Sequence, residues 1–153
     1  MKINHRRFDQ KKILIVSDDP SVHEMMNRAP VGEDCAVLSA SSGTEAFEIA
    51  VAVCIDLVVL DLSLPTKNGW DALEELKAKN PLLSVIIITA KSDGSFSALS
   101  SGVGVLLKKP LHFVKLFETV SYLLTESVEA RLERIAGKRA AFHYLPAKQN
   151  ALL

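Results

Sequence analysis

Five side chains of this sequence stand at positions that suit phosphoryl chemistry. Asp18 and Asp19 directly follow the first short apolar run of the chain, and Asp61 ends the third. Thr89 ends the fourth run, and Lys109 follows the fifth. Carboxylate oxygens at a shallow, partly hydrated site suit Mg²⁺, a hard ion that keeps several waters and pairs with phosphate. A carboxylate beside such a cation and a lysine is equipped to accept a phosphoryl group.

The apolar runs predict the strands that position these side chains. They are Ile13 to Val16, Cys35 to Ala40, Leu57 to Leu60, Val85 to Thr89 and Val103 to Leu107. Four have the continuous apolar character of strands buried on both faces, whereas the second ends among serines and suits an edge strand. Segments with helical spacing follow the runs and begin near Pro20, Thr44, Asn68, Ser92 and Leu111. This alternation predicts an α/β, doubly wound (βα)5 flavodoxin-like fold with a five-stranded parallel sheet of order 2-1-3-4-5.

The predicted strand order brings the acidic residues together. Its switch point lies between the first and third strands, so Asp18, Asp19 and Asp61 are expected at one carboxyl edge of the sheet. Mg²⁺ and Lys109 together would balance three carboxylates. An Asp before Pro20 at a helix start is explained equally well by capping, so both readings of Asp19 stay open.

Composition limits the possible functions. The chain has 153 residues, with 48% hydrophobic and 6% aromatic content, which suits one domain with an aliphatic core. The 18 basic and 18 acidic residues cancel, so neither nucleic acid nor an anionic membrane is an expected partner. No apolar stretch reaches the roughly 18 to 20 residues that cross a bilayer, and no secretory signal is present. The cytoplasm is therefore the expected location.

The domain organisation is predicted from these patterns. Residues 1–11 form a basic N-terminal arm, residues 12–125 the main domain, and residues 126–153 a helical extension and tail. In the extension Val128, Leu132 and Ile135 form an apolar stripe, so the last helix is expected to continue to about Ala136. Packing on its own domain and packing in a homodimer remain equal alternatives for this stripe, and the segment after it is expected to be a loose tail. Two cysteines without metal-site spacing, Cys35 and Cys54, are expected to pack as small apolar residues.

The ordered motifs resemble the receiver domain of two-component response regulators over about residues 12–125. The motifs are Ser17-Asp18-Asp19, Val58-Val59-Leu60-Asp61, Pro65 and Gly69, Ile88-Thr89-Ala90, and Lys108-Lys109-Pro110. The resemblance implies that Asp61 accepts a phosphoryl group from the phosphohistidine of a sensor histidine kinase or histidine phosphotransfer protein. It also implies that Mg²⁺ is held by Asp18, Asp19, Asp61 and the backbone carbonyl of Ser63. Thr89 and Lys109 would contact the phosphoryl oxygens, and the Lys109–Pro110 bond is a candidate cis peptide.

The sequence departs from the family at two places. Leu106 stands where the family has an aromatic switch residue, three places before the lysine, so the usual rotamer switch is not expected. The serine- and glycine-rich segment from Ser92 to Gly102 predicts a short or mobile fourth helix. Ser63 and Lys91 stand where the family tunes the removal of the phosphoryl group by water.

The leading hypothesis is a stand-alone receiver that signals by binding a downstream protein, with no enzyme activity beyond its own phosphorylation and dephosphorylation. A receiver-like domain that no longer switches by phosphorylation is one alternative. A second is a small Mg²⁺-dependent aspartyl-phosphate phosphatase of the haloacid-dehalogenase type. Ser63 argues against it, because that chemistry needs an acid and base two places after the nucleophile. A flavin-binding electron carrier is disfavoured because the first loop is acidic where a phosphate cradle would lie.

Overall fold

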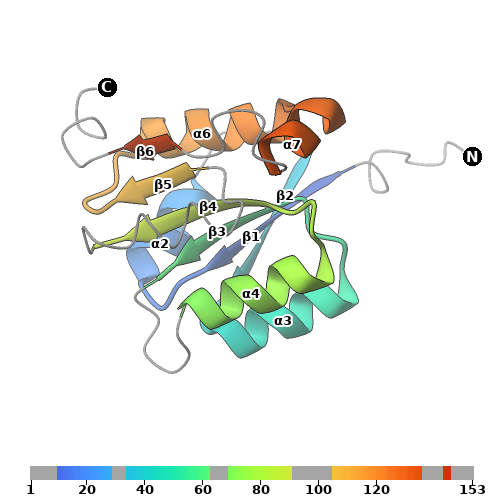
Figure 1. Ribbon diagram of the computed structural model, residues 1–153. Helices are drawn as coiled ribbons and strands as arrows, with labels where there is room; N and C mark the ends of the chain where they lie inside the picture. The colour runs from blue at the N-terminus through green and yellow to red at the C-terminus, as the bar shows by residue number, and fades with distance from the viewer. Residues whose placement is uncertain (1–9, 29–33, 63–68, 91–104, 136–142, 146–153) are drawn as a thin grey trace, which may run out of the picture.

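Strands and helices alternate along the chain and form a parallel sheet with helices on both faces (Figure 1). The computed structural model describes residues 10–28, 34–62, 69–90, 105–135 and 143–145. The strands are β1 (Lys11–Val16), β2 (Cys35–Ala40), β3 (Leu57–Asp61), β4 (Ser84–Thr89), β5 (Val105–Lys108) and β6 (His143–Leu145). The helices are α2 (Pro20–Asn27), α3 (Gly43–Ala52), α4 (Gly69–Lys79), α6 (Phe113–Thr125) and α7 (Val128–Ile135).

The sheet has the order β2-β1-β3-β4-β5-β6, and every pair of neighbours is parallel. The order of the first five strands confirms the predicted doubly wound topology, with β2 at an edge. The sixth strand was not predicted. His143–Leu145 pairs with β5 along Val105–Leu107, so the expectation of a loose tail is wrong for these residues. The physical reason is that an edge strand leaves backbone N–H and C=O groups unpaired until another strand joins it.

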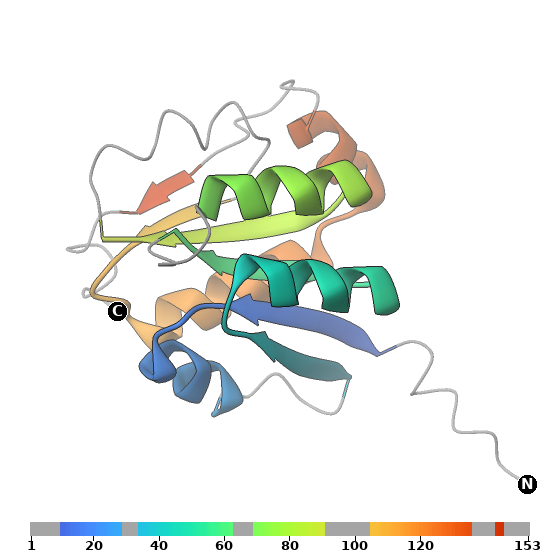
Figure 2. The same cartoon turned by 90° about the horizontal axis from the view of Figure 1, so that it is seen from below.

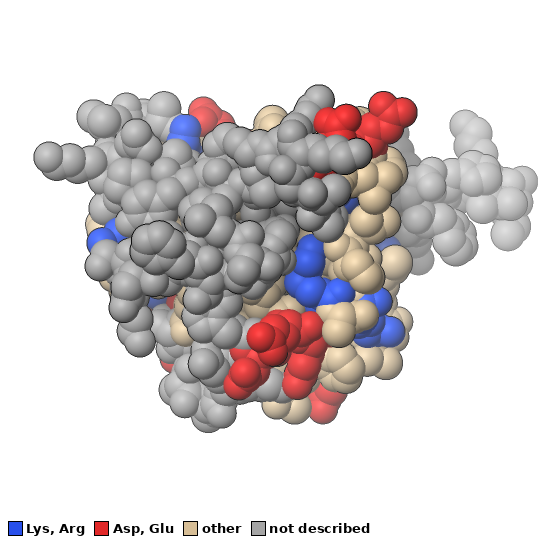
Figure 3. Space-filling model, in the orientation of Figure 1, with Lys and Arg blue, Asp and Glu red and all other residues tan. Residues whose placement is uncertain are grey.

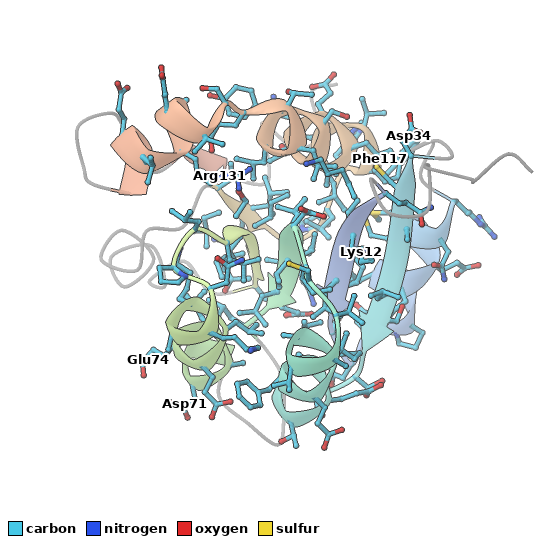
Figure 4. The ribbon with its side chains drawn as sticks, turned by 90° about the vertical axis from the view of Figure 1, so that its right-hand side faces the viewer. Lys12, Asp34, Asp71, Glu74, Phe117 and Arg131 are labelled. Atoms are coloured by element: carbon cyan, nitrogen blue, oxygen red, sulfur yellow. The ribbon has the colours of Figure 1, made fainter. Side chains whose placement is uncertain are left out.

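The two faces of the sheet carry separate halves of the core. Along β1, Leu14 and Val16 pack on the side of α3 and α4, whereas Ile13 and Ile15 pack on the side of α2 and α6. Figure 2 shows α3 and α4 in front of the sheet, and Figure 4 shows the sheet between the two helical layers. Because helices cover both faces, the strands are continuous apolar runs rather than alternating ones.

Helix α4 shows how the sequence pattern assigns one face to the core. Leu73 and Leu76 are buried against the sheet, while Asp71 and Glu74 project away from it (Figure 4). Acidic and basic side chains lie side by side over the region of α3 and α4 (Figure 3). The helix ends at Lys79, directly before Asn80 and Pro81. The helix predicted to begin near Asn68 is therefore confirmed.

The C-terminal helical segment differs from the prediction in one respect. Instead of one continuous helix, α6 ends at Thr125 and α7 begins at Val128. Ser127 causes the break, because its hydroxyl accepts the Ala130 N–H at 3.1 Å and starts a new helix. Val128 and Leu132 are 64% and 47% exposed, so much of each side chain is open to solvent. Packing on the own domain and packing in a homodimer both stay predictions.

The two cysteines differ in burial. Cys35 is partly buried and packs beside the core on the α2 and α6 side, and this burial raises the pKa of its thiol. Cys54 is exposed in the turn between α3 and β3, so the prediction that it packs as a small apolar residue is wrong.

Among the helices in the described ranges, none combines the length and the apolar character needed to span a bilayer.

Gly69 provides a direct test of the close packing beside the site. A Cβ at this position would lie 2.7 Å from Leu62 Cα and 2.9 Å from Leu62 Cδ2. The first contact is with backbone, so the chain would have to move at the residue that follows Asp61. Gly69→Ala is expected to lower the free energy of unfolding by about 1 to 3 kcal/mol, as overpacking does. Urea unfolding measures the change, with the exposed Glu74→Ala on the same helix as control. An unfolding midpoint equal to that of the wild type would contradict the prediction.

Candidate functional site

Asp61 is the centre of the site. It is the last residue of β3, and its side chain is fully buried. Its Oδ2 accepts hydrogen bonds from Lys109 Nζ at 2.9 Å and from the Ser17 hydroxyl at 3.0 Å. Burying a carboxylate costs several kcal/mol unless the group is paired and hydrogen-bonded. These two bonds therefore compensate much of the hydration that Asp61 loses in the sheet.

Lys109 reaches Asp61 from the end of β5. Its backbone N–H donates to the Thr89 carbonyl at 2.8 Å, which extends the ladder between β4 and β5 by one bond. The Lys109–Pro110 peptide bond is cis, which confirms the expectation from the resemblance. Lys109 Nζ also lies 3.7 Å from Asp19 Oδ2. One positive charge thus serves two carboxylates, of which Asp61 is the nearer.

Asp18 and Asp19 have different environments. Asp19 caps α2, because its Oδ1 accepts the Ser21 hydroxyl at 2.7 Å and the Ser21 N–H at 2.9 Å. The pKa of the Asp19 carboxyl is lowered from its ordinary value, chiefly by these two hydrogen bonds. Asp18 is exposed, and within the described ranges its side chain has no hydrogen bond or ion pair. The capping explanation of Asp19 is therefore confirmed, while Asp18 keeps its carboxylate open to solvent.

The predicted set of magnesium ligands is brought together only in part. Lys109 Nζ contacts both Asp19 and Asp61, so a positive charge already lies beside both acids. Ser63, the fourth predicted ligand, lies outside the described residues. In the part of the chain that the structure describes, no three His, Cys, Asp or Glu side chains form a group that could hold a metal by itself. Any cation here would keep water or phosphate oxygens among its ligands, which is the normal habit of Mg²⁺.

Ser17 belongs to the site although the sequence did not single it out. Its side chain is 1% exposed and bonds directly to Asp61. The pairing of β1 with β3 explains the contact, because Ile13 pairs with Leu57 and Val16 with Leu60. Both pairs are 44 residues apart in the sequence, and so are Ser17 and Asp61. The constant offset was the signal that could have identified Ser17.

Thr89 and Leu106 lie where the sequence predicted them. Thr89 is the last residue of β4 and is 2% exposed, one place beyond Ile88, the residue that pairs with Asp61. Leu106 is fully buried in β5, on the face that α3 and α4 cover. A buried leucine has no ring or hydroxyl to exchange between two contacts. The predictions for Lys91 and for the segment from Ser92 to Gly102 lie outside the described residues.

The comparison with known families identifies the family to which this fold belongs. A family model described as the response regulator receiver domain matches residues 13–121. This chain belongs to the receiver domain family. The match begins inside β1 and ends in α6, so it includes Ser17, Asp61, Thr89 and Lys109.

Curated relatives of this receiver domain are transcriptional regulators. ZraR of Klebsiella oxytoca is 36% identical over 121 residues, which cover 78% of this chain and 27% of that protein. CusR of Escherichia coli (strain K12) is 28% identical over 124 residues, which cover 80% of this chain and 55% of that protein. The receiver domain thus spans about a quarter to a half of the length of these relatives.

Solved structures agree with this assignment. The non-phosphorylated HemR receiver domain from Leptospira biflexa is 26% identical with a TM-score of 0.70, over 77% of this chain and 97% of that one. A receiver domain from Clostridium thermocellum is 29% identical with a TM-score of 0.66, over 74% and 94% of the two chains. The resemblance and fold class inferred from the sequence are therefore confirmed, and neither the phosphatase nor the flavin-carrier alternative is favoured.

Proposed function

We propose that this receiver domain accepts a phosphoryl group on Asp61 in the presence of Mg²⁺ and passes the signal on by binding another protein. The donor would be the phosphohistidine of a sensor histidine kinase or a histidine phosphotransfer protein. The observation that carries the proposal is the buried Asp61 carboxylate, held by Lys109 Nζ at 2.9 Å at the carboxyl end of β3. Buried charged pairs cluster at functional sites, and the carboxyl edge of a doubly wound sheet is where such folds bind their ligands.

The donor set fits a magnesium ion that keeps several water ligands. Asp61 and the exposed Asp18 supply hard carboxylate oxygens next to the end of β1 and β3. Asp19 is less suited, because one of its oxygens caps α2 and the other faces Lys109. When bound, Mg²⁺ would neutralise negative charge on the phosphoryl oxygens. Asp18 and Asp61 are accordingly the ligands that we assign, with Asp19 in a secondary role.

The transfer itself asks little covalent chemistry of the protein. An oxygen of the Asp61 carboxylate forms the new bond to phosphorus while the bond from phosphorus to the donor's ring nitrogen breaks. The ring nitrogen keeps the electron pair of that bond. The Lys109 ammonium would move from Asp61 toward the phosphoryl oxygens and donate hydrogen bonds to them, and the Thr89 hydroxyl would donate to them as well.

The phosphorylated state would be transmitted through β4 and β5. Lys109 is tied to Thr89 by the backbone hydrogen bond at 2.8 Å, so a movement of either residue reaches the other strand. Because Leu106 is an aliphatic core residue, the response would depend on this backbone connection rather than on an aromatic rotamer. The downstream protein would then bind a surface that differs between the two states.

The test is phosphorylation by a small phosphodonor such as acetyl phosphate, followed by intact mass measurement. Wild-type protein in millimolar Mg²⁺ is expected to gain one phosphoryl group, and a chelator is expected to prevent the gain. The same gain without divalent metal would contradict the assigned role of Mg²⁺. No gain under any condition would contradict the proposed function as a whole.

A further inference from the structure

Ser17 connects three elements of the fold to the phosphoryl acceptor. Its backbone N–H donates to the Ala40 carbonyl of β2 at 3.0 Å, and its carbonyl accepts from His23 Nε2 of α2 at 2.6 Å. Its hydroxyl oxygen accepts the Asp19 N–H at 3.0 Å and donates to Asp61 Oδ2 at 3.0 Å. Every polar group of a nearly fully buried residue is therefore used.

The directions of the two hydroxyl bonds follow from the donor inventory. The Asp19 N–H can only donate, so the Ser17 oxygen must accept that bond. The Asp61 carboxylate, paired with Lys109, accepts, so the single hydroxyl hydrogen of Ser17 points at Oδ2. Rotation of the hydroxyl away from Asp61 would break this charge-assisted bond, and the other group bonded to the hydroxyl, the Asp19 N–H, offers the hydrogen no acceptor. The hydroxyl is fixed in one orientation.

Ser17 and Lys109 hold the same oxygen of Asp61 in different ways. Lys109 has a long side chain that is 24% exposed and lies near Asp19 as well. Ser17 follows a buried strand, and its hydroxyl oxygen is positioned by a single side-chain torsion. Its backbone N–H and its carbonyl are both hydrogen-bonded. When Lys109 turns toward the phosphoryl oxygens, as the proposed function requires, the Ser17 bond remains on Asp61.

We propose that Ser17 is a positioning residue for phosphoryl transfer: its hydroxyl fixes the rotation of the Asp61 carboxylate while Lys109 changes partners. This inference rests on the proposed function. The alternative is a purely structural role, in which Ser17 only accepts the Asp19 N–H at the start of α2. In a variant that still folds, loss of the hydroxyl lowers the rate of phosphoryl transfer only if Ser17 positions Asp61.

The structure offers a matched control for the removal of this hydroxyl. Ser84 is also a strand-associated serine with 1% exposure, and its hydroxyl has no hydrogen-bond partner among the described residues. Ser84 begins β4, at the opposite end of that strand from Thr89. Ser17→Ala and Ser84→Ala therefore make the same chemical change, near Asp61 and far from it.

The experiment compares the full-length variants in phosphorylation by acetyl phosphate over a range of donor concentrations, with saturating Mg²⁺. Ser17→Ala is expected to lower the saturating rate about ten-fold, the equivalent of one charge-assisted hydrogen bond, while the half-saturating donor concentration stays unchanged. Ser17→Cys keeps the shape with a weak donor and is expected to lose rate as well, whereas Ser17→Thr keeps a hydroxyl and recovers most of the rate. Ser84→Ala is expected to match the wild type.

A second measurement does not depend on phosphorylation. In metal-free protein, the side-chain carboxyl carbon of Asp61 is expected to shift or broaden in the NMR spectrum of Ser17→Ala but not of Ser84→Ala. A wild-type saturating rate in both Ser17→Ala and Ser17→Cys would overturn the inference, and so would an equal loss in Ser84→Ala. A wild-type protein that is never phosphorylated would contradict the proposed function instead, and the carboxyl signal would still decide whether Ser17 orients Asp61.

Discussion

Asp61→Asn is expected to reduce phosphorylation by a small phosphodonor to the background of the assay. Asparagine has nearly the same shape, and its amide oxygen can still accept the bonds from Ser17 and Lys109 that the structure shows. The fold should therefore persist. The amide oxygen carries no full negative charge, so it does not attack phosphorus as a carboxylate does. Intact mass after incubation with acetyl phosphate and Mg²⁺ measures the loss.

Asp71→Asn is the matched control for this substitution. Asp71 is exposed in the first turn of α4 and projects away from the sheet (Figure 4). The control removes the same charge and is expected to gain one phosphoryl group as the wild type does. A full mass gain in Asp61→Asn would mean that another residue is the acceptor. Peptide mapping after borohydride reduction, which converts an aspartyl phosphate to homoserine, would then identify it.

Lys109→Met is expected to lower the free energy of unfolding by about 3 kcal/mol, near the lower end for breaking a buried ion pair. The reason is that Asp61 is fully buried and loses the positive charge of Lys109, while 24% of the Lys109 side chain is exposed and already partly screened. Methionine retains most of the aliphatic volume of lysine, so the loss reports mainly on charge. Urea unfolding without divalent metal measures it.

Two further variants separate the charge effect from packing. Lys109→Arg keeps a positive charge and should be less destabilised than Lys109→Met. In the Asp61→Asn background, Lys109→Met should lower the free energy of unfolding much less, because no buried carboxylate is then left without its cation. The same cost in both backgrounds would show that Lys109 acts by packing. Addition of Mg²⁺ should restore part of the stability of Lys109→Met if the ion binds beside Asp61 in the folded state.

Most of the fold was predictable because local signals agreed with the global topology. The apolar runs marked β1, β3 and β4, and the serines after Cys35–Ala40 marked an edge strand. Strand β6 was not predictable in the same way. A three-residue strand has too few positions to show a period, and its pairing depends on the open edge of β5 rather than on its own sequence.

The charged part of the site was predicted more completely than its neutral part. Asp61 and Lys109 are conspicuous because a charge at the end of an apolar run needs an explanation. Ser17 is neutral and common at strand ends, so only the register of β1 on β3 identifies its role. That register follows from which residues of each strand face the two halves of the core, which the sequence does not state directly. The dual use of Asp19, as helix cap and as a neighbour of Lys109, depends on the same packing.

The sixth strand also changes how the sheet meets other molecules. Without β6, the outer backbone of β5 would be an open template onto which a strand of a second chain could add, one residue away from Lys109. With β6 in place, β5 is an interior strand and the template is occupied by the protein's own chain. The edge of the sheet on this side is therefore β6, a strand of three residues, and so short an edge offers few backbone groups for pairing with a second chain.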